Sequence, residues 1–182
     1  MSDVTAVSDI IYGVIQEQRA LHPGRPVLIG VAGAQGSGKT TACQLLEMAN
    51  RPRFAHFSLD DVYLTKAERV WRADNVSSFD PYRDMDGNLQ VDHKPRPDIE
   101  RLLLTRGPPG THDLNLAKGV IARLMRSEAT ALPRFDKAAD DRAPEETWPR
   151  FEGRAEAILV DGWCLGAKPT GLAAEPLNDV ER

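Results

Sequence analysis

Residues 33–40 read Gly-Ala-Gln-Gly-Ser-Gly-Lys-Thr, so that glycines at fixed places are followed directly by a lysine and a threonine. This is the P-loop pattern, whose glycines let successive backbone N–H groups turn toward phosphate oxygens. Lys39 can then reach the β- and γ-phosphates as a catalytic group, and the Thr40 hydroxyl can ligate Mg²⁺. The pattern predicts a nucleoside triphosphate site, with contacts from Gly33, Ala34, Gln35, Gly36, Ser37, Gly38, Lys39, Thr40 and Thr41.

The segments on either side of the P-loop support this prediction. The apolar, β-branched run from Val27 to Val31 precedes it and is typical of a buried strand. Thr41 to Met48 has the pattern of a helix, whose N-terminus would face the phosphates. A glycine-rich turn that matches by chance is the alternative, and it would need neither flank.

Carboxylates follow two further predicted strands. Phe54 to Leu59 ends in Asp60-Asp61, and Ala157 to Val160 ends in Asp161. Ligands gather at the carboxyl ends of parallel strands, so we expect these groups to lie near the P-loop. Asp60 is the predicted catalytic base and Asp161 the predicted magnesium carboxylate. The alternatives are a capping pair at Asp60-Asp61 and a turn or helix cap at Asp161.

Two polar loops could present side chains to a substrate. Residues 106–113 combine two prolines, two glycines and the hydrogen-bonding end Thr-His-Asp. Residues 133–142 carry both signs of charge, so a cation there could pair with a substrate carboxylate or with phosphate. A plain turn into a helix explains the first loop equally well, and a solvated charge run explains the second.

The elements that position these groups alternate between strand and helix. Besides the three strands, helical spacing of apolar residues predicts helices over Asp3 to Ala20 and Asp113 to Met125, with Thr111 or Asp113 as N-cap. Shorter helices are expected near Thr65 to Trp71 and Asp98 to Leu104. Strand, helix and strand in succession imply a parallel pair and an α/β fold.

Two stretches lack any helical or alternating pattern. Residues 74–100, rich in turn signals, are expected to form a surface insertion, and Pro133 to Pro149 is expected to be loop. The length of 182 residues predicts one domain over 1–182, which includes this insertion.

The composition indicates which kinds of partner and which compartment to expect. The formal net charge of −4 gives no basic surplus for nucleic acid or a membrane surface, so a small-molecule substrate is expected. Only Cys43 and Cys164 occur, which favours a reducing compartment. No membrane span or signal peptide is visible, so a cytoplasmic location is expected. The oligomeric state is not indicated.

Five blocks together resemble the D-glycerate 3-kinase family and, more broadly, the uridine kinase, phosphoribulokinase and pantothenate kinase superfamily. They are Gly33 to Thr40, Ser58 to Thr65, Arg106 to Asp113, Leu132 to Lys137 and Ile158 to Trp163. The resemblance implies a P-loop NTPase three-layer sandwich with a parallel sheet. It implies ATP and Mg²⁺ at Lys39 and Thr40, a catalytic Asp60, an acidic strand end at Asp161, and transfer of phosphate from ATP to a hydroxyl of glycerate.

The same blocks are expected to shape the substrate pocket. The side chains predicted to contact substrate are Asp61, Tyr63, His112, Asp113, Arg134, Asp136 and Lys137. Two rival functions stay open: a kinase for another hydroxylated metabolite or a nucleoside, and a nucleotide-binding protein without turnover.

The chain departs from the family in two ways. Residues 74–100 intervene where the family runs directly into the Arg-Gly-Pro-Pro-Gly segment. The family also continues well past Trp163 with further strands and a lid, so we expect a C-terminally truncated form of low isolated stability. In such kinases the P-loop strand is central, and missing strands would leave its far edge uncovered.

Overall fold

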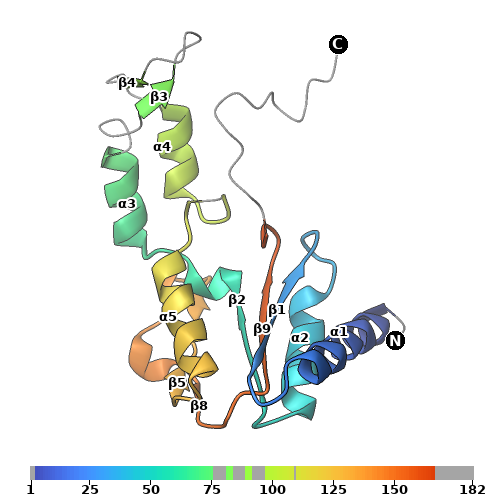
Figure 1. Ribbon diagram of the computed structural model, residues 1–182. Coiled ribbons are helices and arrows are strands. Elements are labelled where there is room, and N and C mark those ends of the chain that lie inside the picture. The colour runs from blue at the N-terminus through green and yellow to red at the C-terminus, as the bar shows by residue number, and fades with distance from the viewer. Residues whose placement is uncertain (1–2, 76–80, 84–88, 92–96, 109, 167–182) are drawn as a thin grey trace, which may run out of the picture.

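Three parallel strands form the central sheet of the computed structural model, which describes residues 3–75, 81–83, 89–91, 97–108 and 110–166. The strands are β1 (Val27–Ala32), β2 (Phe54–Ser58) and β9 (Ala157–Gly162), in the order β1-β9-β2 (Figure 1). Val27 and Phe54 both lie opposite Ala157, so the three strands start level and end at the same edge. The predicted parallel sheet is confirmed.

The position of β1 agrees with the expectation that the far edge of the P-loop strand is uncovered in this chain. Among the described residues, β9 pairs with both other strands and β1 lies at an edge. The burial of the strands agrees with this order, because every residue of β9 is buried while β1 alternates between buried or half-buried and exposed residues. A strand with neighbours on both sides reads as a continuous apolar run, as Ala157 to Val160 does.

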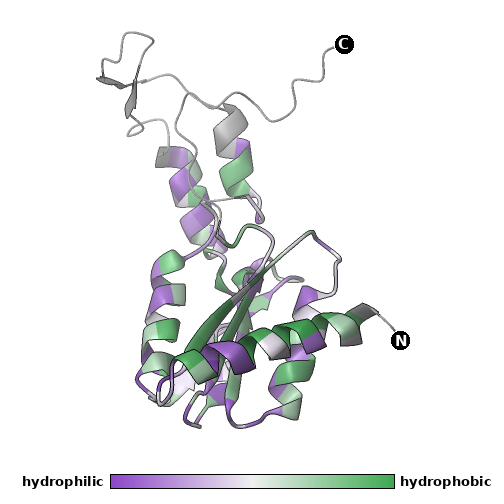
Figure 2. Cartoon of the chain, turned by 45° about the vertical axis from the view of Figure 1, so that its right-hand side comes forward, coloured by the Kyte–Doolittle hydropathy of each residue, from purple (hydrophilic) through white to green (hydrophobic). Residues whose placement is uncertain are grey.

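Helices cover both faces of the sheet and complete the predicted three-layer sandwich. Helices α1 (Asp3–Leu21) and α2 (Lys39–Ala49) lie on one face, where Ile15, Cys43 and Leu159 belong to one core cluster. Helix α5 (Leu114–Met125) lies on the other, and its apolar side packs on strand residues in a second cluster. Figure 2 shows the hydrophobic strands enclosed between helices that carry hydrophilic residues.

The chain between β2 and α5 leaves the sheet and returns. It forms the 3₁₀ helix η1 (Leu59–Val62), α3 (Lys66–Asn75), β3 (Pro81–Arg83), β4 (Leu89–Val91) and α4 (Pro97–Leu104). Helices α3 and α4 lie side by side at one end of the molecule (Figure 1), and β3 pairs with β4 in antiparallel fashion. The helix expected at Asp98 to Leu104 is confirmed as α4. Sequence periodicity did not predict β3 or β4, because three residues are too few to show an alternation.

The chain between α5 and β9 contains short elements. Two-residue strands pair as β5 (Thr130–Ala131) with β8 (Arg150–Phe151) and as β6 (Phe135–Asp136) with β7 (Asp141–Arg142). A 3₁₀ turn, η3 (Glu145–Thr147), lies between them. Of these elements, β6, β7 and η3 lie within the loop that was expected at Pro133 to Pro149. Within the described residues, no helix is both long and apolar enough to cross a membrane.

Gly162 at the end of β9 is required by close packing. A Cβ atom there would lie 2.7 Å from Leu59 Cβ and 3.0 Å from Leu59 Cδ2, whereas a Cβ at Gly30 in β1 would meet nothing within 4 Å. The contact brings η1 directly against the end of β9. Gly162 therefore sets how closely the segment after β2 can approach the central strand.

We predict that Gly162→Ala lowers the free energy of unfolding by about 1–3 kcal/mol, because the added methyl group overpacks the contact with Leu59. Gly30→Ala adds the same group in open space and should change stability by less than about 1 kcal/mol. Chemical denaturation followed by circular dichroism measures both. Equal effects of the two substitutions would contradict the packing explanation.

Candidate active site

The P-loop joins β1 to α2 in the conformation that its glycines allow. Gly36 and Gly38 have φ values of +75° and +80°, in the left-handed region that favours glycine. Helix α2 begins directly afterwards, at Lys39, so its free N–H groups point into the loop. The Lys39 ammonium lies across the loop and donates to the Ala34 carbonyl oxygen at 2.6 Å. This region combines helix-end N–H groups with a cation, as phosphate binding requires.

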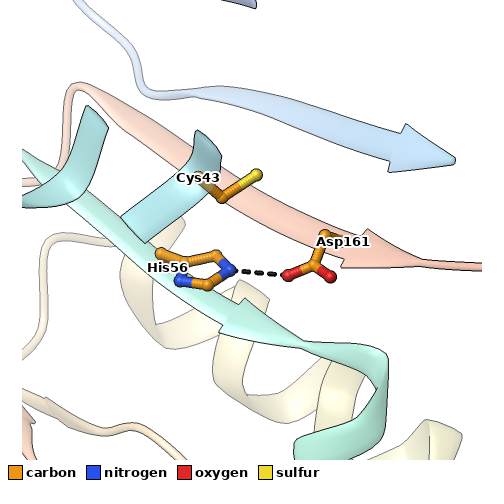
Figure 3. Close-up of side chains that lie close together, drawn as sticks. All are labelled: Cys43, His56 and Asp161. Carbon is orange, nitrogen blue, oxygen red and sulfur yellow. Dashed lines mark hydrogen bonds and ion pairs between the residues drawn. The ribbon is translucent and has the colours of Figure 1, made fainter. Parts of the chain in front are cut away.

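Asp161 is the buried centre of the hydrogen bonds next to the P-loop. Its Oδ2 accepts a hydrogen bond from Thr40 Oγ1 at 2.7 Å and one from Ser58 Oγ at 3.3 Å. Its Oδ1 accepts a hydrogen bond from His56 Nε2 at 2.7 Å (Figure 3). Burial alone would raise the pKa of the Asp161 carboxyl, but the donors His56, Thr40 and Ser58 together lower it below its usual value. The site therefore favours the ionised carboxylate.

Cys43 lies beside the His56–Asp161 pair, and the three offer ligand atoms within 4.8 Å of one another (Figure 3). Burial raises the pKa of the Cys43 thiol to about 12, which keeps it protonated and makes it a poor metal ligand. The imidazole already donates to the carboxylate. We therefore interpret this cluster as a hydrogen-bonded pair with a packed thiol, while the hard oxygens of Thr40 and Asp161 fit Mg²⁺.

A cavity of about 820 Å³ opens at the carboxyl ends of the three strands. The P-loop contributes Gly33, Ala34, Gln35, Gly36, Lys39 and Thr40 to its lining. The remaining lining residues are Ser58, Asp60, Tyr63, Arg106, Gly107, Lys137, Asp161, Gly162 and Trp163. The cavity thus brings the predicted metal and base residues together with most of the predicted nucleotide residues, while Ser37, Gly38 and Thr41 lie outside its lining.

Asp60 faces this cavity from η1. Its Oδ1 accepts a hydrogen bond from the Tyr63 hydroxyl at 2.9 Å, and its Oδ2 lies 3.1 Å from the Lys137 ammonium. Burial, together with the Asp60 carboxylate, raises the pKa of Tyr63, so the phenol stays a donor. The two partners fix the direction of the carboxylate. Tyr63 and Lys137, both predicted as substrate contacts, therefore line the cavity with Asp60.

Asp61 has a different role from its neighbour. Its Oδ2 accepts a hydrogen bond from the backbone N–H of Ser58 at 2.9 Å, as part of the capping box that starts η1. Arg134 lies 3.2 Å from the same oxygen. Burial raises the pKa of Asp61. The capping alternative thus describes Asp61, and the structure places both Asp61 and Arg134 outside the lining of the cavity.

The other predicted substrate residues also lie outside the lining. Asp113 is the N-cap of α5, accepts from the Leu116 N–H at 2.9 Å and pairs with Arg142 at 3.1 Å. His112 is buried and stacks on Tyr63 with ring centroids 4.5 Å apart, and burial lowers its pKa. Asp136 accepts backbone N–H groups of its own turn. Through its stacking, His112 contacts Tyr63, a residue of the cavity wall.

Sequence reasoning did not select Arg106 and Trp163 as site residues. Arg106 Nη1 donates to the Lys137 carbonyl oxygen and to Asp140 Oδ1, each at 3.0 Å, and Trp163 Nε1 donates to the Gly107 carbonyl oxygen at 3.1 Å. These bonds tie the loops after α4 and β9 to the loop of Lys137. A basic residue opening a Gly-Pro loop and an aromatic residue just after a strand end were the available signals.

Comparisons with known proteins agree with this geometry, although no protein-family model matches the chain. The chain is 32% identical to the chloroplastic D-glycerate 3-kinase of Arabidopsis thaliana, over 91% of this chain and 36% of that protein. It is 29% identical to an uncharacterized kinase, mug58, of Schizosaccharomyces pombe, over 93% of this chain and 57% of that protein. The solved D-glycerate 3-kinase from Cryptococcus neoformans superposes with a TM-score of 0.65 at 26% identity, over 90% of this chain and 53% of that one. The chain thus spans from about a third to just over half of the length of these relatives.

We predict that His56→Leu lowers the free energy of unfolding by about 1–3 kcal/mol, because it leaves the buried Asp161 Oδ1 without its donor. His56→Gln keeps an N–H donor on a flexible side chain and should lose less. Thermal and denaturant unfolding at neutral pH compare the two variants with the unsubstituted chain. The interpretation of the cluster is wrong if the leucine variant is as stable as the glutamine variant.

Proposed function

This chain is a homologue of D-glycerate 3-kinase among the P-loop kinases, and we propose that it transfers the γ-phosphate of ATP to a hydroxyl group of glycerate. One observation carries the proposal: the P-loop lysine, the Thr40–Asp161 pair and Asp60 all line a single cavity. Phosphoryl transfer needs a phosphate cradle, a metal site and a group that positions the nucleophile. Candidate residues for all three line this one cavity.

On the nucleotide side, the triphosphate would lie along the P-loop. The N–H groups at the start of α2 and the Lys39 ammonium would bind the β- and γ-phosphates. Thr40 and Asp161 would hold Mg²⁺, which neutralises charge that develops on the phosphates. The hydrogen bonds from His56 and Ser58 keep the Asp161 carboxylate ionised and fixed in direction for that role.

On the acceptor side, Asp60 would accept the proton of the attacking hydroxyl. Its partners Tyr63 and Lys137 stabilise the carboxylate without covering it, since Asp60 keeps 36% of its side chain exposed. Because the transition state of phosphoryl transfer is loose, orientation of the hydroxyl matters more than the strength of the base. A carboxylate held by two partners provides that orientation.

The charge of the acceptor wall favours a small anion as substrate. Arg106 and Lys137 place two cations on the wall that carries Asp60, and the Lys137 side chain is 65% exposed. A glycerate carboxylate could pair with either cation while a hydroxyl faces Asp60. A nucleoside such as uridine has no carboxylate, so it could not form an ion pair with these cations.

The two rival functions give different results in one experiment. An ATP-consumption screen over glycerate, uridine and pantothenate identifies the acceptor if another hydroxylated metabolite is the substrate. A chain that binds ATP and transfers phosphate to none of them would instead be a nucleotide-binding protein without turnover. The expected cytoplasmic location stays a prediction, since the Arabidopsis relative is named as chloroplastic.

We predict that Asp60→Asn lowers kcat with glycerate by about 10²–10⁴-fold while ATP binding is retained, because the substitution removes only the proton acceptor. Lys39→Ala should abolish ATP binding itself. Asp136→Asn is the matched control, since Asp136 is exposed and outside the cavity lining, and it should keep near-normal kcat. Steady-state kinetics and calorimetric ATP binding measure these effects. Retention of turnover in Asp60→Asn would exclude Asp60 as the base.

We predict that Lys137→Met raises KM for glycerate about tenfold or more and changes kcat less, because an ionic contact with the substrate carboxylate is lost. Lys118→Met removes the same charge from the exposed side of α5, outside the lining of the cavity. It should leave KM unchanged. Equal KM values in the two variants would show that Lys137 does not contact the carboxylate.

A further inference from the structure

A second cavity, of about 550 Å³, lies at the opposite end of the sheet from the P-loop. Its walls come from three connections: the turn between α1 and β1, the residues before β2 and the residues before β9. The strands that they precede start level (Figure 1), and the lining residues place the cavity at the amino ends of these strands. We call it the arginine cavity, after its four lining arginines, Arg19, Arg25, Arg53 and Arg154.

The charge of this cavity is opposite to that of the protein. Four guanidinium groups and His22 line it against a single carboxylate, Glu156, on a chain of net charge −4. The other walls are Pro23, Pro52, Ala155 and the backbone of Gly24. A concentration of cations between apolar walls attracts anions more strongly than the same charges spread over an open surface.

The one carboxylate is already engaged. Glu156 Oε2 lies 2.7 Å from Arg19 Nη2 and 3.8 Å from Arg53 Nη1. Among the residues that the structure describes, Arg25 and Arg154 have no ion pair with a carboxylate. Four arginines thus face one carboxylate, which leaves an excess of three positive charges in the lining of the cavity.

The two unpaired arginines are nonetheless held in place. Arg154 Nη2 donates to the Gly24 carbonyl oxygen at 2.9 Å, and Arg25 Nη2 lies 3.0 Å from His22 Nδ1. Both contacts are made with the turn 22–24, so the two guanidinium groups gather around the same short segment. Each retains further N–H donors, because a guanidinium has five. A ligand would therefore meet two exposed guanidinium groups at one short turn.

We propose that the arginine cavity is a binding site for a small polyanion, such as a phosphate ester or a polycarboxylate. Guanidinium groups bind the oxygens of both kinds of anion in a forked, bidentate geometry. The volume accommodates a small metabolite. The site is separate from the one that binds the triphosphate, because it shares no lining residue with it.

The test is a nuclear magnetic resonance titration of the full chain with two probes, inorganic pyrophosphate and tricarballylate. Backbone amide shifts report where each probe binds, so the arginine cavity (residues 22, 24, 25 and 154–156) is read separately from the P-loop (residues 33–40). We expect a saturable shift at the first group. Saturation by pyrophosphate alone identifies a phosphate ligand, by tricarballylate alone a polycarboxylate, and by both a site that selects charge and size.

The variants separate this site from general charge effects. Arg25→Ala with Arg154→Ala should weaken probe binding at the arginine cavity at least about tenfold and leave P-loop shifts unchanged. Arg101→Ala with Arg126→Ala removes the same charge from exposed positions outside the cavity and should leave the affinity unchanged. If the first double variant does not give a folded spectrum, the single variants Arg25→Gln and Arg154→Gln replace it.

Three results would overturn the proposal: no saturable shift at the arginine cavity with millimolar probe, shifts confined to residues 33–40, or equal weakening in both double variants. None of these readouts depends on kinase activity. The outcome is therefore independent of whether glycerate is phosphorylated.

Discussion

The buried carboxylate of Asp161 is the interaction on which the rest of the structure depends. A charge in the middle of a sheet is tolerated only when donors surround it, and these come from two other elements. Thr40 belongs to α2, and His56 and Ser58 belong to β2, so satisfying one carboxylate fixes the first turn of α2 against the ends of β9 and β2. The same bonds that allow Asp161 to be buried therefore place the phosphate cradle relative to the sheet.

The acceptor side of the cavity is built differently, from loops that ion pairs hold together. Arg69, which is buried, donates to the Asp140 carboxylate at 2.7 Å, and Arg106 reaches the other oxygen of the same group. Asp140 thus links α3, the loop after α4 and the turn that carries Lys137. The phosphate side depends on backbone geometry and a buried network, whereas the acceptor side depends on ion pairs among the buried Arg69 and side chains that are partly or largely exposed. Substitutions among those surface side chains offer a direct way to alter the acceptor without altering nucleotide binding.

The features that could be predicted are those that depend on residues close together in the sequence. The P-loop, the three strands, the long helices and the Asp113 cap follow from glycine spacing, apolar runs and capping preferences within a few residues of sequence. The roles of polar loop residues could not be predicted in this way, because Asp60 and Asp61 differ only in the partners of their carboxylates. Ser58 N–H and Arg134 bind the carboxylate of Asp61 and not that of Asp60. His56 stood within an apolar run and carried no signal, since its partner lies 105 residues further along the chain. The two-residue strands between α5 and β9 were missed because two residues are too few to show an alternation.

The level start and level end of the three strands have a further consequence. Six residues at a rise of about 3.3 Å each separate the two ends of the sheet by about 20 Å. A small molecule at one end cannot touch a small molecule at the other, so both ends can be occupied together without competition. The shortest covalent path between the two ends is β9, which follows directly after Glu156 and carries Asp161 as its last residue but one. The central strand β9 would then connect the two ligand sites directly.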